Sequence, residues 1–366
     1  MFGESSVADD YGADLNRWMQ TQGRFHQSVA SIARCDIKAL ESTVRLRSAI
    51  KRAAKDSAMN PWVHKAALPR PRSTRKGGNP KPSLSAYADR ASVASLRKLG
   101  EEALIGQADY KPVEFFERGL HVADSVGRIN SAIGKSGTGF LVGEGILMTN
   151  HHVIGSPEEG GISALTMNLE ENIFGAVKPQ EEFKLNPDAF FYTDAELDVT
   201  LVATSKRSAR GTEVTTFGYL PLIRAEGKIL RGWNVNIIQH PNEGNKVVSF
   251  RNGVLVEIEG PQGQDEYCYY TADTGKGSSG SPVFNDSWEV VALHHHALPK
   301  LDAEGHVLDR QGTRITPAEA LADPSRVDWV ANEGTRVSRI VAAFETADLP
   351  MPFATVRDEL LKLWGK

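Results

Sequence analysis

The second two-thirds of the chain is a succession of short β-rich segments separated by turn residues. From about residue 124 onward, runs such as SVGRINSAI, GTGFLVG, GILMTNHHVI, DVTLVAT and EVVALHHH alternate with Gly, Pro and Asn. Many short strands between turn signals favour an antiparallel sandwich or barrel over alternating βαβ units. We therefore predict a mainly β domain over residues 113–345.

Residues 1–112 have a different texture and predict a helical module. In residues 13–57, apolar side chains recur at steps of 4, 4, 3 and 4 and form one stripe: Val29, Ala33, Ile37, Leu40 and Val44. Residues 60–85 hold five Pro, two Gly and six Lys/Arg without an acid, which predicts a basic, Pro-rich linker. Residues 86–105 are predicted to be helical again, and Pro112 is typical of the first turn of a short helix.

The C-terminal part is predicted to return to helix. The run VDWVANEGTRVSRIVAAFE, residues 327–345, is assigned to helix, and TVRDELLKLW gives residues 346–366 an amphipathic helical tail.

The charge distribution divides the chain at residue 112, where the predicted secondary structure also changes. Residues 1–112 hold 19 Lys/Arg and 11 Asp/Glu, a balance of +8, whereas residues 113–366 hold 23 and 35, a balance of −12, and the two sum to −4. The basic stretch 37–98 suits an acidic partner, the acidic C-terminal module or a solvated helix face. No nucleic-acid motif and no interleaved aromatic residues accompany it, so we expect no nucleic-acid role.

Composition constrains the setting of the protein. No apolar run reaches about 18 residues, so no membrane span is expected, and the first 20 residues lack a basic-then-apolar signal pattern. Cys35 and Cys268 are the two cysteines, which excludes a disulfide-built fold and a Cys-rich zinc site and fits a reducing compartment. We therefore expect a cytoplasmic protein.

Three short segments carry the residue types that acyl transfer needs. They are Thr149-Asn-His-His-Val153, Leu197-Asp-Val-Thr-Leu-Val202 and Gly277-Ser-Ser-Gly-Ser-Pro-Val-Phe284. A serine hydroxyl is too weakly acidic to attack unaided, so it needs a His base, whose tautomer a carboxylate fixes. Ser279 lies between glycines, where its own backbone N–H and that of Gly277 can face a developing oxyanion.

The order of these three segments and the residues around them resemble the trypsin-like (chymotrypsin-fold) serine peptidases, nearest the bacterial branch that includes HtrA-type and glutamyl endopeptidases. The resemblance spans about residues 120–345 and includes Ile238-Gln-His-Pro241 and Ala331-Asn-Glu-Gly334. It implies that His152 is the general base, that Asp198 orients it, that Ser279 is the nucleophile and that Gly277 and Ser279 form the oxyanion hole. It also implies two six-stranded antiparallel β-barrels with the site between them, here preceded by the helical module and followed by a short C-terminal helix.

Details of the segments refine this expectation. Only His152 directly precedes Val153, so His151 is interpreted as a packed or solvent-facing neighbour. Ser278 replaces the Asp that precedes the nucleophile in chymotrypsin-like zymogens, and the barrel does not begin with I-[IV]-G-G. Activation through a new N-terminal ammonium is therefore excluded, and the domain is either competent as made or gated by its N-terminal module.

The residues expected to bind substrate indicate different P1 preferences. Asp273 has the offset from Ser279 at which trypsin carries its basic-selecting Asp. Thr274 and His294 match positions that glutamyl endopeptidases use for an acidic side chain. The alternative is that Asp273 caps a turn and the histidines pack against the sheet. We favour a basic P1 residue, because a buried carboxylate near a pocket needs a cationic partner.

The run His294-His-His296 does not predict a metal site. Adjacent strand residues point to opposite faces, so at most His294 and His296 are expected to converge, with no acidic or Cys partner nearby. We expect neither a metal nor another cofactor.

Together these observations predict a serine endopeptidase that acts on protein or peptide substrates. Its N-terminal helical module is expected to recruit or sense a regulatory partner, a step that rests on analogy. The alternatives are an inactive binding module on a protease fold and an esterase with the same machinery.

Overall fold

The computed structural model describes residues 4–33, 111–258, 260 and 263–365. One compact unit contains the N-terminal helix α1 (Glu4–Ala33) together with residues from 116 onward. The predicted linker at 60–85, the helix at 86–105 and the C-terminal half of the helix at 13–57 lie outside the described residues. The domain boundary predicted at residue 112 stays a prediction.

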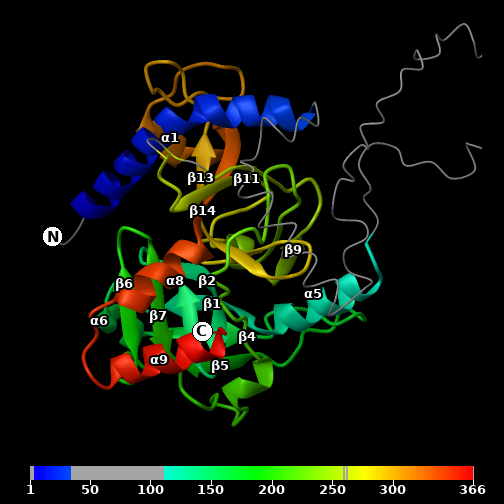
Figure 1. The fold of residues 1–366 in the computed structure, drawn as a ribbon, viewed down its shortest axis with the longest axis vertical. Helices are drawn as coiled ribbons and strands as arrows, with labels where there is room; N and C mark the ends of the chain where they lie inside the picture. The colour runs from blue at the N-terminus through cyan, green and yellow to red at the C-terminus, as the bar shows by residue number, and fades with distance from the viewer. Residues whose placement is uncertain (1–3, 34–110, 259, 261–262, 366) are drawn as a thin grey trace, which may run out of the picture. The chain divides into compact units, whose positions relative to one another are not determined.

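The first half of the β-rich region forms one antiparallel sheet of seven strands (Figure 1). In chain order the strands are β1 (Val126–Ser131), β2 (Ser136–Gly143), β3 (Ile146–Thr149), β4 (Ser163–Met167), β5 (Glu181–Lys184), β6 (Phe191–Asp194) and β7 (Val199–Ala203). Their order across the sheet is β5-β4-β1-β2-β3-β7-β6. A bridge between Leu185 and Thr204 joins the chain after β5 to the chain after β7, so the sheet curls round its core.

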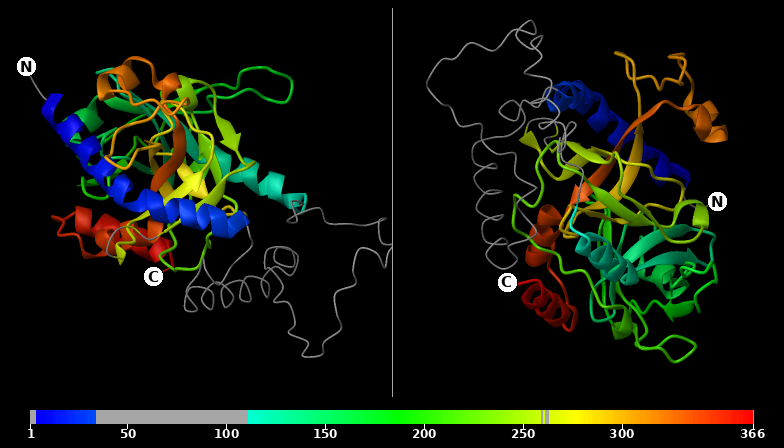
Figure 2. Two further views of the ribbon diagram at one scale, coloured as in Figure 1. Left: turned by 90° about the horizontal axis from the view of Figure 1, so that it is seen from above. Right: turned by 90° about the vertical axis from the view of Figure 1, so that its right-hand side faces the viewer.

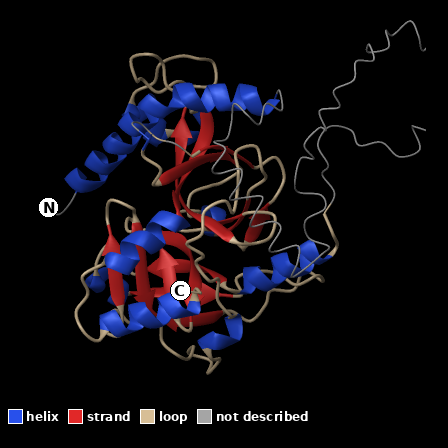
Figure 3. Ribbon diagram, viewed as in Figure 1, coloured by secondary structure: helices blue, strands red, loops and turns tan. Residues whose placement is uncertain are grey.

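The second half forms another antiparallel sheet of seven strands (Figure 3). Its strands are β8 (Asn236–Gln239), β9 (Val247–Ser249), β10 (Val254–Glu257), β11 (Tyr267–Thr271), β12 (Pro282–Phe284), β13 (Val290–Pro299) and β14 (Trp329–Arg336). They are ordered β10-β11-β14-β13-β12-β8-β9, and a bridge between Asn234 and Val254 brings the two sides of the sheet together. Each sheet has its own apolar core, which explains how two folded halves arise from one β-rich run.

Helices cover the sheets. In the views of Figures 1 and 2, α8 (Val337–Thr346) and α9 (Phe353–Leu363) lie beside the first sheet and α1 runs along the second. Trp18 of α1 is fully buried, packs against Phe25 and Tyr269, and donates its indole N–H to the carbonyl of Pro299 at 2.7 Å. A third apolar cluster thus fixes α1 to the second sheet. No helix among the described residues has the length and apolar character that crossing a bilayer requires.

The predicted class, mainly β with two antiparallel sheets and flanking helices, is confirmed. Two details differ. Each sheet has seven strands where six were expected. Residues 329–336, assigned to helix from the sequence, form strand β14 between β11 and β13, and helix begins only at Val337. Pairing on both sides outweighs local helical propensity there.

Candidate active site

His152 and Asp198 form a two-point contact where strand β3 ends and strand β7 begins. His152 lies in the turn after β3, and Asp198 directly precedes β7. The backbone N–H of His152 donates to Asp198 Oδ1 at 2.8 Å, and its Nδ1 lies 2.7 Å from Oδ2. Asp198 is buried, yet the imidazoles of His152 and His295 outweigh that burial and hold the pKa of Asp198 below its usual range.

The backbone around Asp198 is held in an uncommon conformation. Its φ of 46° lies in the left-handed region, which costs on the order of 1–3 kcal/mol for a residue other than glycine. Two side chains fix this turn: Asn150 donates to the carbonyl of Asp198 at 2.9 Å, and Thr335 of β14 donates to that of Leu197 at 2.8 Å. The carboxylate is therefore oriented by both sheets.

The neighbouring His151 points to a different partner. Its Nδ1 lies 2.7 Å from the hydroxyl of Thr193 on β6. The structure thus places His152, and not His151, on the buried carboxylate.

Ser279 lies in a tight turn between two glycines whose φ angles only glycine adopts readily. Gly277 has φ 91° and Gly280 has φ 86°. The carbonyl of Ser279 accepts the N–H of Thr138 on β2 at 2.8 Å, which joins the turn to the first sheet. The half-buried Ser279 hydroxyl lies 3.5 Å from the carbonyl of His295, and no hydrogen bond joins it to His152 among the described residues. Such bonds are often long before substrate binds.

A hydrogen bond fixes the orientation of the peptide group between Lys276 and Gly277. The N–H of Asn242 donates to the carbonyl of Lys276 at 2.5 Å, so the N–H of Gly277 points to the opposite side of that peptide plane. Within the described part of the chain, the N–H groups of Gly277 and Ser279 meet no acceptor. They are available as a pair of donors for an oxyanion.

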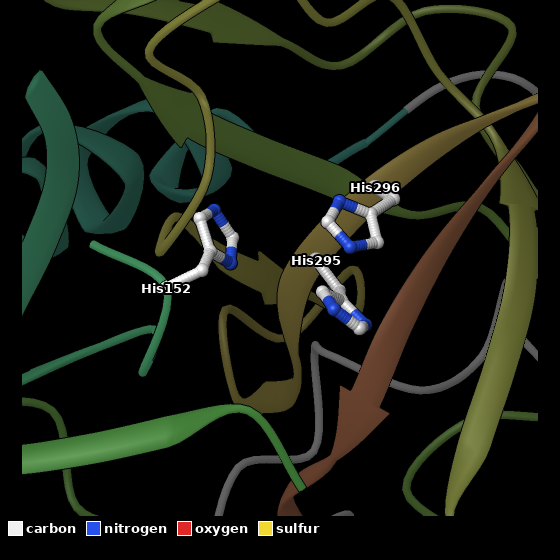
Figure 4. Close-up of side chains that lie close together, drawn as sticks. All are labelled: His152, His295 and His296. Carbon is white, nitrogen blue, oxygen red and sulfur yellow. The ribbon is translucent and has the colours of Figure 1, made fainter. Parts of the chain in front are cut away.

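Two of the three consecutive histidines turn toward this site, which corrects the sequence analysis. His294 pairs with Gly334 but His296 pairs with Glu333, so His295 is an extra residue in a β-bulge. A bulge interrupts the alternation of side chains. His295 and His296, rather than His294 and His296, therefore converge on His152 (Figure 4).

The geometry of these rings does not suit a shared metal ion. Two imidazoles on one tetrahedral zinc keep their centroids about 5 Å apart, because each Zn–N bond is about 2.0–2.1 Å long. The rings of His295 and His296 have centroids only 3.7 Å apart and are tilted by 31°. A second group of possible ligands, Asp302, Glu304 and His306, lies on a surface turn where Arg314 already pairs with both carboxylates.

Behind Asp198 lies a set of charged residues that the sequence analysis missed. His295 Nε2 is 3.1 Å from Asp198 Oδ2, and its Nδ1 is 3.3 Å from Glu333 Oε1 of β14. Arg17 and Asp14 reach the same place from α1. The resemblance included Glu333 in its motif, but nothing in the sequence marked Asp14 or Arg17.

The residues expected to select substrate differ in their surroundings. His294 is fully enclosed, where its Nδ1 lies 2.8 Å from the hydroxyl of Tyr270, and burial lowers its pKa to about 3. Its neutral ring cannot hold an acidic side chain by charge. Thr274 donates to Asn332 at 2.9 Å. Asp273 is exposed, so the buried carboxylate from which a basic P1 residue was expected is not found, and that preference stays untested.

Comparison with known proteins gives a family match over part of the chain. Residues 137–293 match the trypsin-like peptidase domain family. Among curated proteins, "Uncharacterized protein y4fB" of Sinorhizobium fredii is 36% identical over 276 residues, which are 71% of this chain and 42% of that protein. "Secreted RxLR effector protein 73" of Plasmopara viticola is 33% identical over 172 residues, 43% of this chain and 40% of that protein. The matches span about two-fifths of the length of these relatives.

Solved structures give weaker similarities. The Rv3671c protease of M. tuberculosis H37Rv in its inactive form has a TM-score of 0.41 at 17% identity over 67% of this chain and 100% of that chain. Deg5 has a TM-score of 0.36 at 18% identity over 51% of this chain and 88% of that chain.

Proposed function

We propose that this chain is a serine endopeptidase that works through Ser279, His152 and Asp198, because residues 137–293 match the trypsin-like peptidase domain family. The observation that carries the proposal is the two-point contact of His152 with buried Asp198, at 2.8 and 2.7 Å. This contact leaves Nε2 of His152 as the ring nitrogen that can exchange a proton with a serine hydroxyl.

In the proposed first step, the Ser279 hydroxyl attacks the scissile carbonyl carbon while His152 takes its proton. The imidazolium that forms is stabilised by Asp198, which stays ionised because the pKa of its carboxyl is lowered. The carbonyl oxygen gains the negative charge and receives the N–H groups of Gly277 and Ser279. One such donor is typically worth about 2.7–4 kcal/mol of transition-state stabilisation.

In the proposed second step, the C–N bond breaks and His152 gives its proton to the leaving amine, which leaves an ester on Ser279. Water then attacks this acyl-enzyme, with His152 again as the base, and returns the free hydroxyl and a carboxylic acid. No group beyond the chain and water is needed for this balance.

The proposal is tested by treating the wild-type chain and four variants with a fluorophosphonate probe and a diverse peptide mixture read by mass spectrometry. Ser279→Ala should lose labelling, and both Ser279→Ala and His152→Ala should lose about 10⁴-fold or more in turnover. Two adjacent residues give matched controls. Ser278→Ala should still label, because the Ser278 hydroxyl accepts from Gly275 N–H, and His151→Ala should retain turnover.

The same experiment separates the alternatives. Labelling without peptide cleavage, combined with hydrolysis of short esters, would favour an esterase. No labelling of the wild-type chain would favour a binding module on a protease fold. The cut sites report the P1 preference, which the exposed Asp273 no longer predicts.

A further inference from the structure

The bulge on β13 places a second imidazole behind the proposed catalytic carboxylate. The His295 side chain is buried, with Nε2 3.1 Å from Asp198 and Nδ1 3.3 Å from Glu333. His295 therefore lies between two carboxylates, one on each side of its ring.

Glu333 is in turn held by the N-terminal helix. Arg17 of α1 contacts both oxygens of the fully buried Glu333 carboxylate, with Nη2–Oε1 at 2.6 Å and Nε–Oε2 at 3.2 Å. Its guanidinium also lies 3.9 Å above the ring of Tyr267, which is stacked against His295. This fork fixes the position of Glu333 more closely than a single contact would.

A branch of the same network runs along α1. Asp14 lies one turn before Arg17 and is 2.6 Å from it, and its other oxygen is 2.9 Å from Nε2 of His296. The ring of His296 is stacked on that of His152, with centroids 5.3 Å apart. Helix α1 thus reaches the His152–Asp198 pair by two routes.

Charges around His295 come from every element that packs on it. The titratable and charged groups that face it are Asp14 and Arg17 of α1, His152 and Asp198 of the first sheet, Tyr267 of β11, His296 of β13 and Glu333 of β14.

Burial and the neighbouring carboxylates have opposite effects on His295. Burial favours a neutral ring at His295, but the carboxylates around it outweigh burial and raise its pKa, whereas burial and the His295 charge lower the pKa of His296. Asp14, Asp198 and Glu333 therefore favour the protonated form of His295.

We propose that His295 is a positioning residue for His152 and Asp198, and that α1 completes the active centre by fixing His295 through Arg17 and Glu333. This inference rests on the proposed function. The side chains of Arg17 and His295 act through Asp198 and touch no reacting atom. A disturbed network should slow the chemical step more than it weakens substrate binding.

The test measures kcat and KM against pH for wild type, Arg17→Met, Arg17→Lys and Arg24→Met. Arg24→Met is the matched control, because Arg24 lies on the same helix and has no ion pair with any residue in the described ranges. Arg17→Met should lower kcat about tenfold or more with little change in KM. It should also move the acid limb of the kcat/KM profile to higher pH, because Glu333 behind His295 loses its cation. Arg17→Lys should restore part of kcat because it keeps the charge without the fork.

Each outcome decides the proposal. Thermal unfolding of every variant shows whether it is folded, and Arg17→Lys carries the comparison if Arg17→Met is not. Equal kcat and equal pH profiles in the Arg17 variants and Arg24→Met would overturn the inference while wild-type cleavage upholds the proposed function. A faster Arg17→Met enzyme would overturn it too, since α1 would then restrain the site. A wild-type chain that neither labels nor cleaves removes both.

Discussion

Gly280 shows how little space separates the two sheets beside the proposed nucleophile. A Cβ atom at this position would lie 2.1 Å from the carbonyl oxygen of Thr138 and 2.4 Å from the hydroxyl of Thr149, and φ is 86°. We expect Gly280→Ala to lower the free energy of unfolding by about 3 kcal/mol, the sum of a left-handed backbone and an overpacked contact. Urea unfolding measures this change.

Gly134 is the matched control for that substitution. It has a similar φ of 81°, but nothing lies within 4 Å of the place where its Cβ would be. Gly134→Ala should therefore cost only the backbone part, about 1–2 kcal/mol. Equal losses in the two variants would show that the Thr138 contact does not limit the position.

At the scale of elements, one large side chain helps to attach α9 to the first sheet. Trp364, just after α9, is buried and packs on Phe344 of α8, with ring centroids 5.7 Å apart. It donates its indole N–H to the carbonyl of Val142 at 2.7 Å. Trp364→Ala should lower the free energy of unfolding by about 3–5 kcal/mol, through lost burial and an unpaired carbonyl. Denaturant unfolding followed by circular dichroism gives the value.

Leu363 offers a comparison on the same helix. Its side chain is 39% exposed, so Leu363→Ala should cost less than about 1 kcal/mol. If the two alanine variants unfold at the same urea concentration, Trp364 does not anchor α9.

At the scale of the whole molecule, two buried histidines should make stability depend on pH. Burial lowers the pKa of His294 to about 3 and that of His240 to about 4. Both rings are neutral when folded but take up protons near pH 6.5 when unfolded. Their contribution is complete above pH 6.5 and is lost as the pH falls towards 4, by about 1.4 kcal/mol per pH unit for each ring.

The measurement is the free energy of unfolding at several pH values between 7 and 4. His294→Gln should reduce the slope by about one proton, roughly 1.4 kcal/mol per pH unit. The exposed His306 gives the control, since His306→Gln removes an imidazole that solvent surrounds in both states. A slope that His294→Gln leaves unchanged would contradict the assignment of a neutral buried ring.

The sequence predicted the β architecture and the residue types of the candidate site better than it predicted which residues contact one another. Turn residues between short apolar runs were enough to indicate antiparallel β structure, and the resemblance implied that it forms two halves. Strand β14 was missed because its sequence suits a helix and only pairing with β11 and β13 makes it a strand.

The prediction for the histidine run was wrong for a related reason. Alternation along a strand is a local rule, whereas the bulge at His295 depends on register with β14. Asp14 and Arg17 were equally hidden, because an acid and a base three residues apart occur on many solvated helices. Only the packing of α1 on the second sheet shows what they face.

The contacts of Thr138 show which parts of the chain must be synthesised before the proposed site is complete. It contacts Gly277 and Ser279, about 140 residues later in the sequence, through its hydroxyl and its N–H. A nascent chain that has completed only its first sheet holds His152 and Asp198 but not Ser279. The proposed cleavage chemistry should therefore begin only after both halves have emerged and joined.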